Sequence, residues 1–249
     1  DPTPSSEAVC IVMSSLPNTV AKVTGVHRQP AMFRQDPGHN PEMTLEIHHH
    51  EVLTPPVHAA SVILLRDSPE GLQVLLLKRH SKSNVLGGAY VFPGGSVDLA
   101  DADVHHVAVG LDDQSASQRL SLESGGLAYY VACLREVFEE SGLLLALTES
   151  GEYLKLNDAA TRERFSEHRR ALNAREITFR DIIAQEKLRL DLTALEYYSH
   201  WVTPIGPPRR FDTRFFVALA PEHQEAAHDA GETVADTWIT PSDALERVR

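Results

Sequence analysis

Residues 135–142, which read REVFEESG, place three glutamates on a segment whose pattern predicts a helix. Apolar residues recur over residues 127–138 at spacings of four, three and four, as an amphipathic helix requires. Glu136, Glu139 and Glu140 therefore stand at i, i+3 and i+4, on neighbouring positions of one helix face. The closing glycine is typical of a residue just past a helix end. The chain must thus accommodate a helix with a crowded acidic face.

This acidic face needs a positive partner, because like charges so close together repel. No lysine or arginine stands between Glu136 and Glu140, so a divalent cation is the natural partner. Hard carboxylate oxygens favour Mg²⁺ or Mn²⁺. The alternative is an ordinary solvated helix, since acidic residues crowd many exposed faces. The surrounding sequence decides between the two.

The acidic segment and its surroundings resemble the Nudix box, the signature of a family of diphosphate hydrolases. Its core reads Arg-Glu-apolar-any-Glu-Glu-any-Gly-apolar, and residues 135–143 match every specified position, downstream of a Phe-Pro-Gly-Gly bend at 92–95. The usual box places an acid six positions after a glycine and leaves seven residues between that acid and the arginine. Gly95 and Asp101 fit the first spacing, but aspartate replaces the usual glutamate and 33 residues separate it from Arg135. The box therefore carries an insertion of about 26 residues, which leaves the role of Asp101 open.

The resemblance implies an α/β fold, a Nudix-type α/β/α sandwich around a mixed sheet. The insertion lies inside the box, and a small helical insert follows further along the chain. The resemblance also implies Mg²⁺ or Mn²⁺ as cofactor. Glu136 and Glu140 would be the leading metal ligands. Glu139 would share in ligation or orient a metal-bound water for catalysis.

Three further residues take roles from the same resemblance. Arg135 would support catalysis structurally by pairing with one of the acids, and the bend at Gly95 would bring backbone carbonyls near the metal. Glu232, in a loop before the last predicted strand, would add a metal ligand or a general base. Its alternative is an ordinary exposed loop glutamate.

Sequence outside the core box carries a second resemblance. Residues 87–98, the long insertion, and the segments 199–204 and 209–216 look like the peroxisomal-type acyl-coenzyme A diphosphatase branch of the family and its bacterial relatives. The similarity runs from about residue 59 to the end of the chain. It implies hydrolysis of coenzyme A or acyl-coenzyme A to 3′,5′-ADP and phosphopantetheine or its acyl form.

Coenzyme A carries a 3′-phosphate and a diphosphate, which arginines can grip through paired hydrogen bonds. Trp201 or Phe211 would stack on the adenine. Each of these residues has a plainer alternative, because arginines at strand ends are usually solvated and aromatics beside strands usually pack in the core. The candidate substrate-binding residues are Arg79, Trp201, Arg209, Arg210 and Arg214.

Two other functions remain open from the sequence. The first keeps the chemistry but changes the substrate to NADH, ADP-ribose or a nucleotide sugar. The second is a non-catalytic Nudix-fold binding module, which the intact acidic segment disfavours, since such a module need not retain mutually repelling acids.

The rest of the chain divides into an extension and one domain. Residues 1–56 lack a sustained helix or strand period and are expected to form an N-terminal extension. Residues 57–249 are expected to form the hydrolase domain, with an irregular loop over 98–124 and a helical insert at about 158–188. The insert is either a lid over the ligand or a homodimer contact. Strands are expected at residues 59–65, 73–77, 197–202, 213–219 and 236–239.

Charge and composition exclude several partners. A formal net charge of −12 argues against sequence-independent nucleic-acid binding, which needs lysine and arginine to displace counterions. A small-molecule diphosphate is therefore the expected partner, and it must be received by a local cluster of cations. The chain shows neither a membrane-spanning apolar run nor a signal peptide, so the sequence predicts a cytoplasmic protein with no membrane partner. Two cysteines make a disulfide framework improbable.

Overall fold

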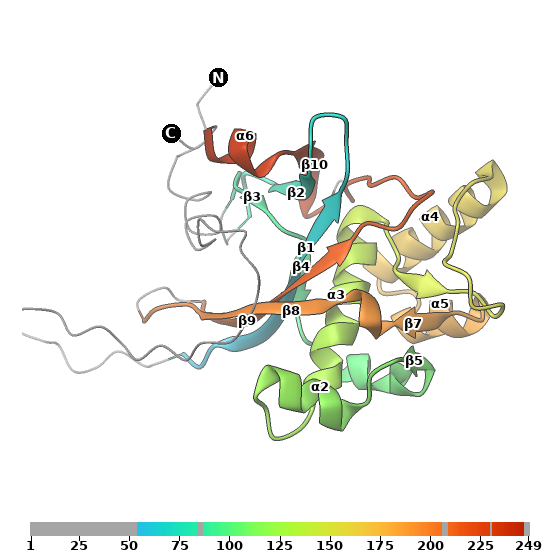
Figure 1. Ribbon diagram of the computed structural model, residues 1–249, viewed down its shortest axis with the longest axis horizontal. Coiled ribbons are helices and arrows are strands. Elements are labelled where there is room, and N and C mark those ends of the chain that lie inside the picture. Colours follow the sequence, from blue (N-terminus) through green and yellow to red (C-terminus); the bar gives the residue numbers. More distant parts are fainter. Residues whose placement is uncertain (1–53, 84–86, 206–208, 230, 247–249) are drawn as a thin grey trace, which may run out of the picture.

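The structure is a computed structural model that describes residues 54–83, 87–205, 209–229 and 231–246. Nearly all of the N-terminal extension expected over residues 1–56 lies outside this part of the chain. The described residues form a twisted sheet with helices on both faces and a group of helices at one end (Figure 1). None of the helices in the described ranges has the length and apolar character needed to cross a bilayer.

The main sheet contains seven strands within the described residues, and five of them run in the order β10-β2-β1-β9-β8. β1 pairs in parallel with β9 and antiparallel with β2 and β4, so the sheet is mixed, as expected. Its strands are β1 (Val57–Arg66), β2 (Gln73–Arg79), β3 (Tyr90–Val91), β4 (Gly94–Ser96), β8 (Glu196–Val202), β9 (Phe211–Leu219) and β10 (Thr233–Ile239). A smaller sheet contains β5 (Ala108–Val109), β6 (Ala146–Leu147) and β7 (Arg189–Asp191).

Helices cover the two faces of the main sheet unequally. The helices are η1 (Leu99–Val107), α2 (Asp113–Leu120), α3 (Gly126–Ser141), α4 (Ala159–Asn173), α5 (Phe179–Gln185), η2 (Leu192–Ala194) and α6 (Pro241–Glu246). The long α3 crosses one face, and the short α6 covers part of the other (Figure 1). The two cores together make the α/β/α sandwich that the sequence predicts.

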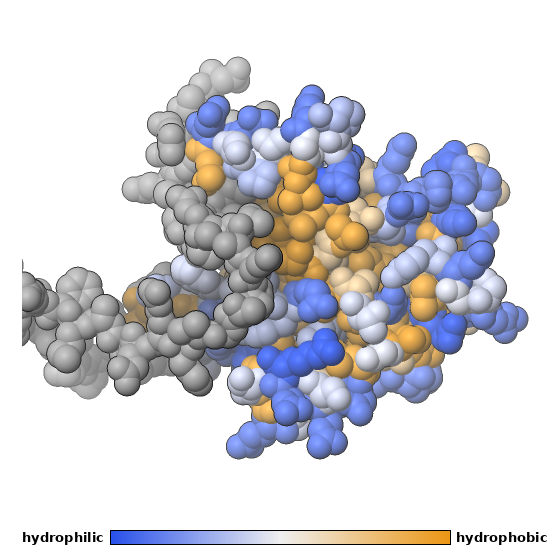
Figure 2. All heavy atoms as spheres, viewed as in Figure 1, coloured by the Kyte–Doolittle hydropathy of each residue, from blue (hydrophilic) through white to orange (hydrophobic). Residues whose placement is uncertain are grey.

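The apolar residues of β1 alternate between these two cores. Val62 and Leu64 are fully buried with Leu134 and Phe138 of α3, whereas Ile63 packs in the core that includes Ala244 of α6. Successive side chains of a strand point to opposite faces, so a strand covered on both sides needs a continuous apolar run. Figure 2 shows the molecule from the same side as Figure 1. Hydrophilic side chains lie over the periphery of this view, and apolar ones lie at its centre, where the strands meet α3.

The expectation of an irregular loop over residues 98–124 is wrong, because η1, β5 and α2 lie there. Asp98 and Asp101 form a reciprocal capping box that starts η1, and Asp112 accepts a hydrogen bond from the Ser115 backbone at the start of α2. α2 then packs closely against α3, since a Cβ on Gly126 would overlap the Ser117 backbone. Local caps and close packing, rather than an apolar period, define these helices.

The helical insert, formed by α4 and α5, docks on the C-terminal end of α3. Asp158 caps α4, and Thr178 with Asp181 forms a capping box at the start of α5. The guanidinium Nε of Arg169 and the amide of Asn173 both donate to the Glu139 carbonyl, at 2.8 and 3.2 Å. These bonds satisfy one of the free carbonyls at the helix end and fix the insert beside the acidic face.

Candidate active site

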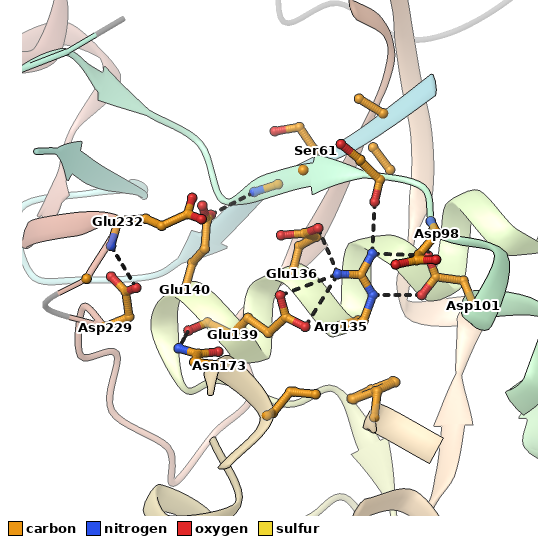
Figure 3. A pocket seen from close by; sticks show the side chains of 18 of the residues that line it. Ser61, Asp98, Asp101, Arg135, Glu136, Glu139, Glu140, Asn173, Asp229 and Glu232 are labelled. Carbon is orange, nitrogen blue, oxygen red and sulfur yellow. Dashed lines mark hydrogen bonds and ion pairs between the residues drawn. The ribbon is translucent and has the colours of Figure 1, made fainter. Parts of the chain in front are cut away.

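A cavity of about 1320 Å³ lies along the acidic face of α3, between the main sheet and the helical insert. Figure 3 shows Glu136, Glu139 and Glu140 along the helix, with Ser61 of β1 on one side and Asn173 of the insert on the other. The cavity therefore collects the three glutamates of the acidic segment at one place that a ligand can enter.

Arg135 is the hub of the ion-pair network at one end of this cavity. Its Nε donates to Asp101 Oδ1 at 2.7 Å, and its Nη2 donates to the Ser96 carbonyl at 2.8 Å. Its Nη1 donates to Glu136 at 2.8 Å and to Glu139 at 3.4 Å (Figure 3). Burial lowers the pKa of Arg135, but Asp101 and the two glutamates outweigh this and raise it above its usual range.

Asp101, whose role the insertion left open, is part of this network. Its side chain is 1% exposed, and it also accepts a hydrogen bond from the Asp98 backbone at 2.7 Å. The residues that separate it from Arg135 fold as η1, β5, α2 and the first part of α3, which bring the two back together. The insertion therefore preserves the pairing of the acid and the arginine.

The carboxylates of the acidic face are short of positive charge. Burial raises the pKa of Glu136 to about 7, with Arg135 lowering it and Glu139 raising it further. Burial also raises the pKa of Glu139. Burial raises the pKa of Glu140 well above its usual range, and repulsion from Glu136 raises it further. Three acids with raised pKa values on one face favour a bound cation.

Two glycines let the backbone of β4 approach these acids. A Cβ on Gly95 would overlap the carboxylate of Glu136, and a Cβ on Gly94 would overlap the backbone of β1. The Gly94 N–H donates to Glu140 Oε2 at 2.9 Å. Backbone polar groups therefore reach the acidic face at a distance that a side chain would prevent.

The carboxylate oxygens of this site are suitable ligands for a hard divalent cation, although each carboxylate accepts a hydrogen bond from another group of the protein. No group of three or more His, Cys, Asp or Glu side chains in the described ranges is already arranged to hold a metal ion. Glu136 and Glu139 turn to Arg135, and Glu140 turns to Gly94. A cation that entered would compete with Arg135 for two of the carboxylates.

Glu232 lies at the other end of the cavity from Arg135 (Figure 3), and Arg79 lines the cavity beside it. The Glu232 side chain is 70% exposed, and its Oε2 lies 3.8 Å from Nη2 of Arg79. The charge of Glu232 helps to raise the pKa values of Glu139 and Glu140, so the three carboxylates are electrostatic neighbours. The structure thus brings Glu232 to the acidic face from a loop far along the chain.

Asp229 also lines the cavity and was not selected from the sequence. It accepts hydrogen bonds from the backbones of Glu232 and Thr233 at 2.9 and 2.8 Å. Burial raises its pKa, but these bonds outweigh burial and lower it. Asp229 therefore holds the loop of Glu232 in place, a pattern that its local spacing to Thr233 could have indicated.

Three of the five candidate substrate-binding residues lie outside the lining of the cavity. Arg214 is buried, donates to Asp212 at 2.9 Å and lies 4.7 Å from the Tyr129 ring centre, because alternation along β9 turns it toward α3. Arg210 donates to the Thr203 carbonyl. Trp201 is 45% exposed on the edge strand β8. None of these side chains is placed to contact a ligand in the cavity.

Arg79, Arg209 and Phe211 do line the cavity. The guanidinium of Arg209 lies 5.4 Å from the centre of the Phe211 ring. Two arginines of the helical insert, Arg175 and Arg180, also line it and were not predicted. No sequence signal identifies them, since only the docking of the insert on α3 brings them to the site.

The raised pKa of Glu136 predicts how metal-free stability depends on pH. A carboxyl whose folded pKa is raised from 4.5 to about 7 stabilises the fold fully below about pH 4.5 and loses this contribution as the pH rises through 7. The loss corresponds to roughly 3 kcal/mol. We expect the Tm of wild type in EDTA to fall more between about pH 5 and pH 8 than that of Glu136→Gln, and Mg²⁺ to restore it mainly at pH 8. The same pH dependence in both proteins would contradict this assignment.

The chain matches one family of known proteins over most of its length. The family model described as the NUDT19 Nudix domain matches residues 52–249. Acyl-coenzyme A diphosphatase NUDT19 of Xenopus laevis is 29% identical over 205 residues, which cover 70% of this chain and 54% of the relative. The Homo sapiens protein of the same name is 30% identical over 216 residues, which cover 71% and 56%. The chain therefore spans little more than half the length of these relatives.

A solved structure supports the same fold. The crystal structure of a NUDIX hydrolase from Alicyclobacillus acidocaldarius is similar with a TM-score of 0.61 and 28% sequence identity. The similarity covers 78% of this chain and 83% of that one. The mixed α/β fold expected from the sequence is confirmed by this likeness.

Proposed function

The chain belongs to the NUDT19 Nudix domain family, and we propose that it hydrolyses the diphosphate of coenzyme A or acyl-coenzyme A. The products would be 3′,5′-ADP and phosphopantetheine or acyl-phosphopantetheine. One observation carries the proposal: Glu136, Glu139 and Glu140 line a single cavity and all have raised pKa values. The relatives that the chain matches over about half their length are acyl-coenzyme A diphosphatases by name, which supports the choice of substrate.

Nudix hydrolases generally use divalent metal ions, and Mg²⁺ or Mn²⁺ suits the oxygen donors here. The carboxylates of Glu136, Glu139 and Glu140, with a backbone carbonyl near Gly95, would hold the metal. When bound, a divalent cation neutralises diphosphate oxygens and lowers the pKa of an attacking water. Arg135 would position Glu136 and Glu139 through the bonds that it already donates to them.

A proton must leave the attacking water, and two acids face the cavity for this task. Glu139 lies on the helix with a side chain that is 25% exposed. Glu232 lies across the cavity, held by the Asp229 loop and 3.8 Å from Arg79. We assign Glu139 to orienting the water and Glu232 to accepting its proton, because Glu232 is not drawn into the Arg135 network.

The substrate is anionic, whereas the chain carries a net charge of −12. Local cations must therefore attract it. Arg79 lies beside the carboxylates and suits the diphosphate, and Arg209 lies over Phe211 further along the cavity. Both keep the substrate-binding role expected from the sequence. Trp201, Arg210 and Arg214 are left out of it, because they do not line the cavity.

A substrate panel tests this proposal. The 249-residue protein is incubated with Mg²⁺ and coenzyme A, acetyl-coenzyme A, NADH, ADP-ribose or a nucleotide sugar, and the products are separated by chromatography. We expect 3′,5′-ADP from both coenzyme A substrates at a kcat/KM well above those for the others. Cleavage of another diphosphate without release of 3′,5′-ADP from coenzyme A would favour the alternative substrates. Absence of any cleavage would favour a binding module.

A further inference from the structure

Two arginines of the helical insert, Arg175 and Arg180, face the same cavity as the glutamates of α3. Both are exposed, and neither forms an ion pair or a side-chain hydrogen bond with another described residue, although the charge of Arg180 helps to lower the pKa of the adjacent Asp181. The other arginines of the insert differ, because each is already engaged. Those engaged arginines are Arg162 and Arg169, which donate to backbone carbonyls, and Arg164 and Arg170, which pair with glutamates.

The position of Arg175 is fixed relative to the acidic face. α4 ends in a left-handed turn at Arg175, whose φ is 59°, and the Arg175 N–H donates to the Leu172 carbonyl at 2.9 Å. Asn173, two residues earlier, donates to the Glu139 carbonyl at 3.2 Å, as Figure 3 shows. The backbone turn is thus tied through Asn173 to the helix that carries the glutamates, and Asn173 lies on the side of that helix away from Ser61 (Figure 3). Arg180 follows on the first turn of α5.

The cations around the cavity are not equivalent. Arg135 is saturated by Asp101 and two glutamates, and Arg79 lies 3.8 Å from Glu232 beside the metal-binding face. Arg209 is a single guanidinium over Phe211 on the side of the sheet. Lys82 also lines the cavity, but as a single ammonium. Among the described residues that line the cavity, only the insert supplies two arginines, Arg175 and Arg180, that form no ion pair. A pair of guanidiniums suits a phosphate monoester dianion, which accepts several charge-assisted hydrogen bonds.

We propose that Arg175 and Arg180 bind the 3′-phosphate of coenzyme A and make the helical insert the part of the molecule that selects for this phosphate. The inference rests on the proposed function. Coenzyme A has one phosphate besides its diphosphate, and the diphosphate must lie over Glu136 and Glu140. The adenosine half then lies toward the insert. The pantetheine half then lies along the sheet side of the cavity, beside Phe211. In this arrangement Phe211 does not stack on the adenine, contrary to the expectation from the sequence.

The test compares coenzyme A with 3′-dephospho-coenzyme A as substrates for the full chain. We expect wild type to prefer coenzyme A. Arg175→Ala and Arg180→Ala should each lower kcat/KM for coenzyme A about 10-fold, and the double variant about 100-fold, through loss of charge-assisted hydrogen bonds. The value for 3′-dephospho-coenzyme A should stay within about twofold. The matched control is Arg170→Ala, on α4 of the same insert, 68% exposed and outside the cavity lining, which should change kcat/KM for neither substrate.

A second measurement compares two nucleotides as inhibitors. Adenosine 3′,5′-bisphosphate should inhibit wild type more strongly than AMP does. The two nucleotides should inhibit the double variant equally. An equal loss of kcat/KM for both substrates in the Arg175 and Arg180 variants would overturn the inference. So would a result in which only Arg209→Ala loses the preference for coenzyme A over 3′-dephospho-coenzyme A. In either case, coenzyme A cleavage by wild type would leave the proposed function standing. Failure of wild type to cleave coenzyme A would overturn both.

Discussion

Replacing Glu140 by glutamine is expected to reduce kcat/KM for coenzyme A by a factor on the order of 1,000 or more. The change removes one ionisable oxygen donor from the acidic face and keeps the size of the side chain. The amide oxygen can still accept the hydrogen bond that Gly94 donates to Glu140 at 2.9 Å. Loss of activity would therefore report the lost charge rather than a changed backbone.

The same variant should be more stable than wild type when no metal is present. Burial and the neighbouring Glu136 raise the pKa of Glu140 well above its usual range, so the ionised carboxyl opposes folding near neutral pH. A neutral glutamine removes this cost. We expect the Tm in EDTA to rise by a few degrees while activity falls, as when function requires a destabilised site.

Glu163→Gln is the matched control for Glu140→Gln. Glu163 lies on α4 with a side chain that is 69% exposed, and it is not part of the cavity lining. Both activity and Tm should stay close to wild type in this control. Full hydrolase activity in Glu140→Gln, or a lower metal-free Tm, would contradict the role given to Glu140.

Replacing Arg135 by methionine is expected to lower the free energy of unfolding by about 3 to 5 kcal/mol. Asp101, whose side chain is 1% exposed, would lose both bonds from the guanidinium, and Glu136 and Glu139 would repel each other without it. An unpaired charge in a buried position is costly, because the desolvation of that charge is no longer compensated. Urea unfolding of the metal-free protein measures the difference.

A double-mutant cycle separates this ion pair from the rest of the site. Asp101→Asn removes the acid, and the combined variant should be less destabilised than the sum of the single changes by roughly 1 to 3 kcal/mol. Additive losses would show that Arg135 and Asp101 do not stabilise each other. The cycle would then remove the reason for treating Asp101 as the acid of the interrupted box.

The parts of the fold with a strong period were predictable from sequence. The apolar spacing over residues 127–138 locates α3, and the two apolar runs before it locate β1 and β2. The capped segments η1 and α2 were missed, because side-chain caps at Asp98 and Asp112 define them instead of a period. Periodicity therefore found the central layer and overlooked the elements packed at its edge.

The site was predictable only where its residues share one element. Glu136 and Glu140 lie on one helix, whose geometry fixes their spacing. Arg175 and Asp229 reach the cavity through tertiary packing, which no local pattern encodes. Arg214 illustrates a different failure, since its position on β9 determines which face it takes, and that face packs on α3. The cytoplasmic location, the homodimer and the role of residues 1–56 stay predictions.

We propose that the carboxylates of α3 bind the divalent cations used in diphosphate hydrolysis. Isothermal titration of wild type with Mn²⁺, beside Glu136→Gln at the same protein concentration, tests it most directly. We predict binding by wild type and a loss of at least about tenfold in affinity in the variant, since one charged oxygen ligand is removed. Absence of Mn²⁺ binding by wild type, or equal affinity in the variant, would contradict the claim.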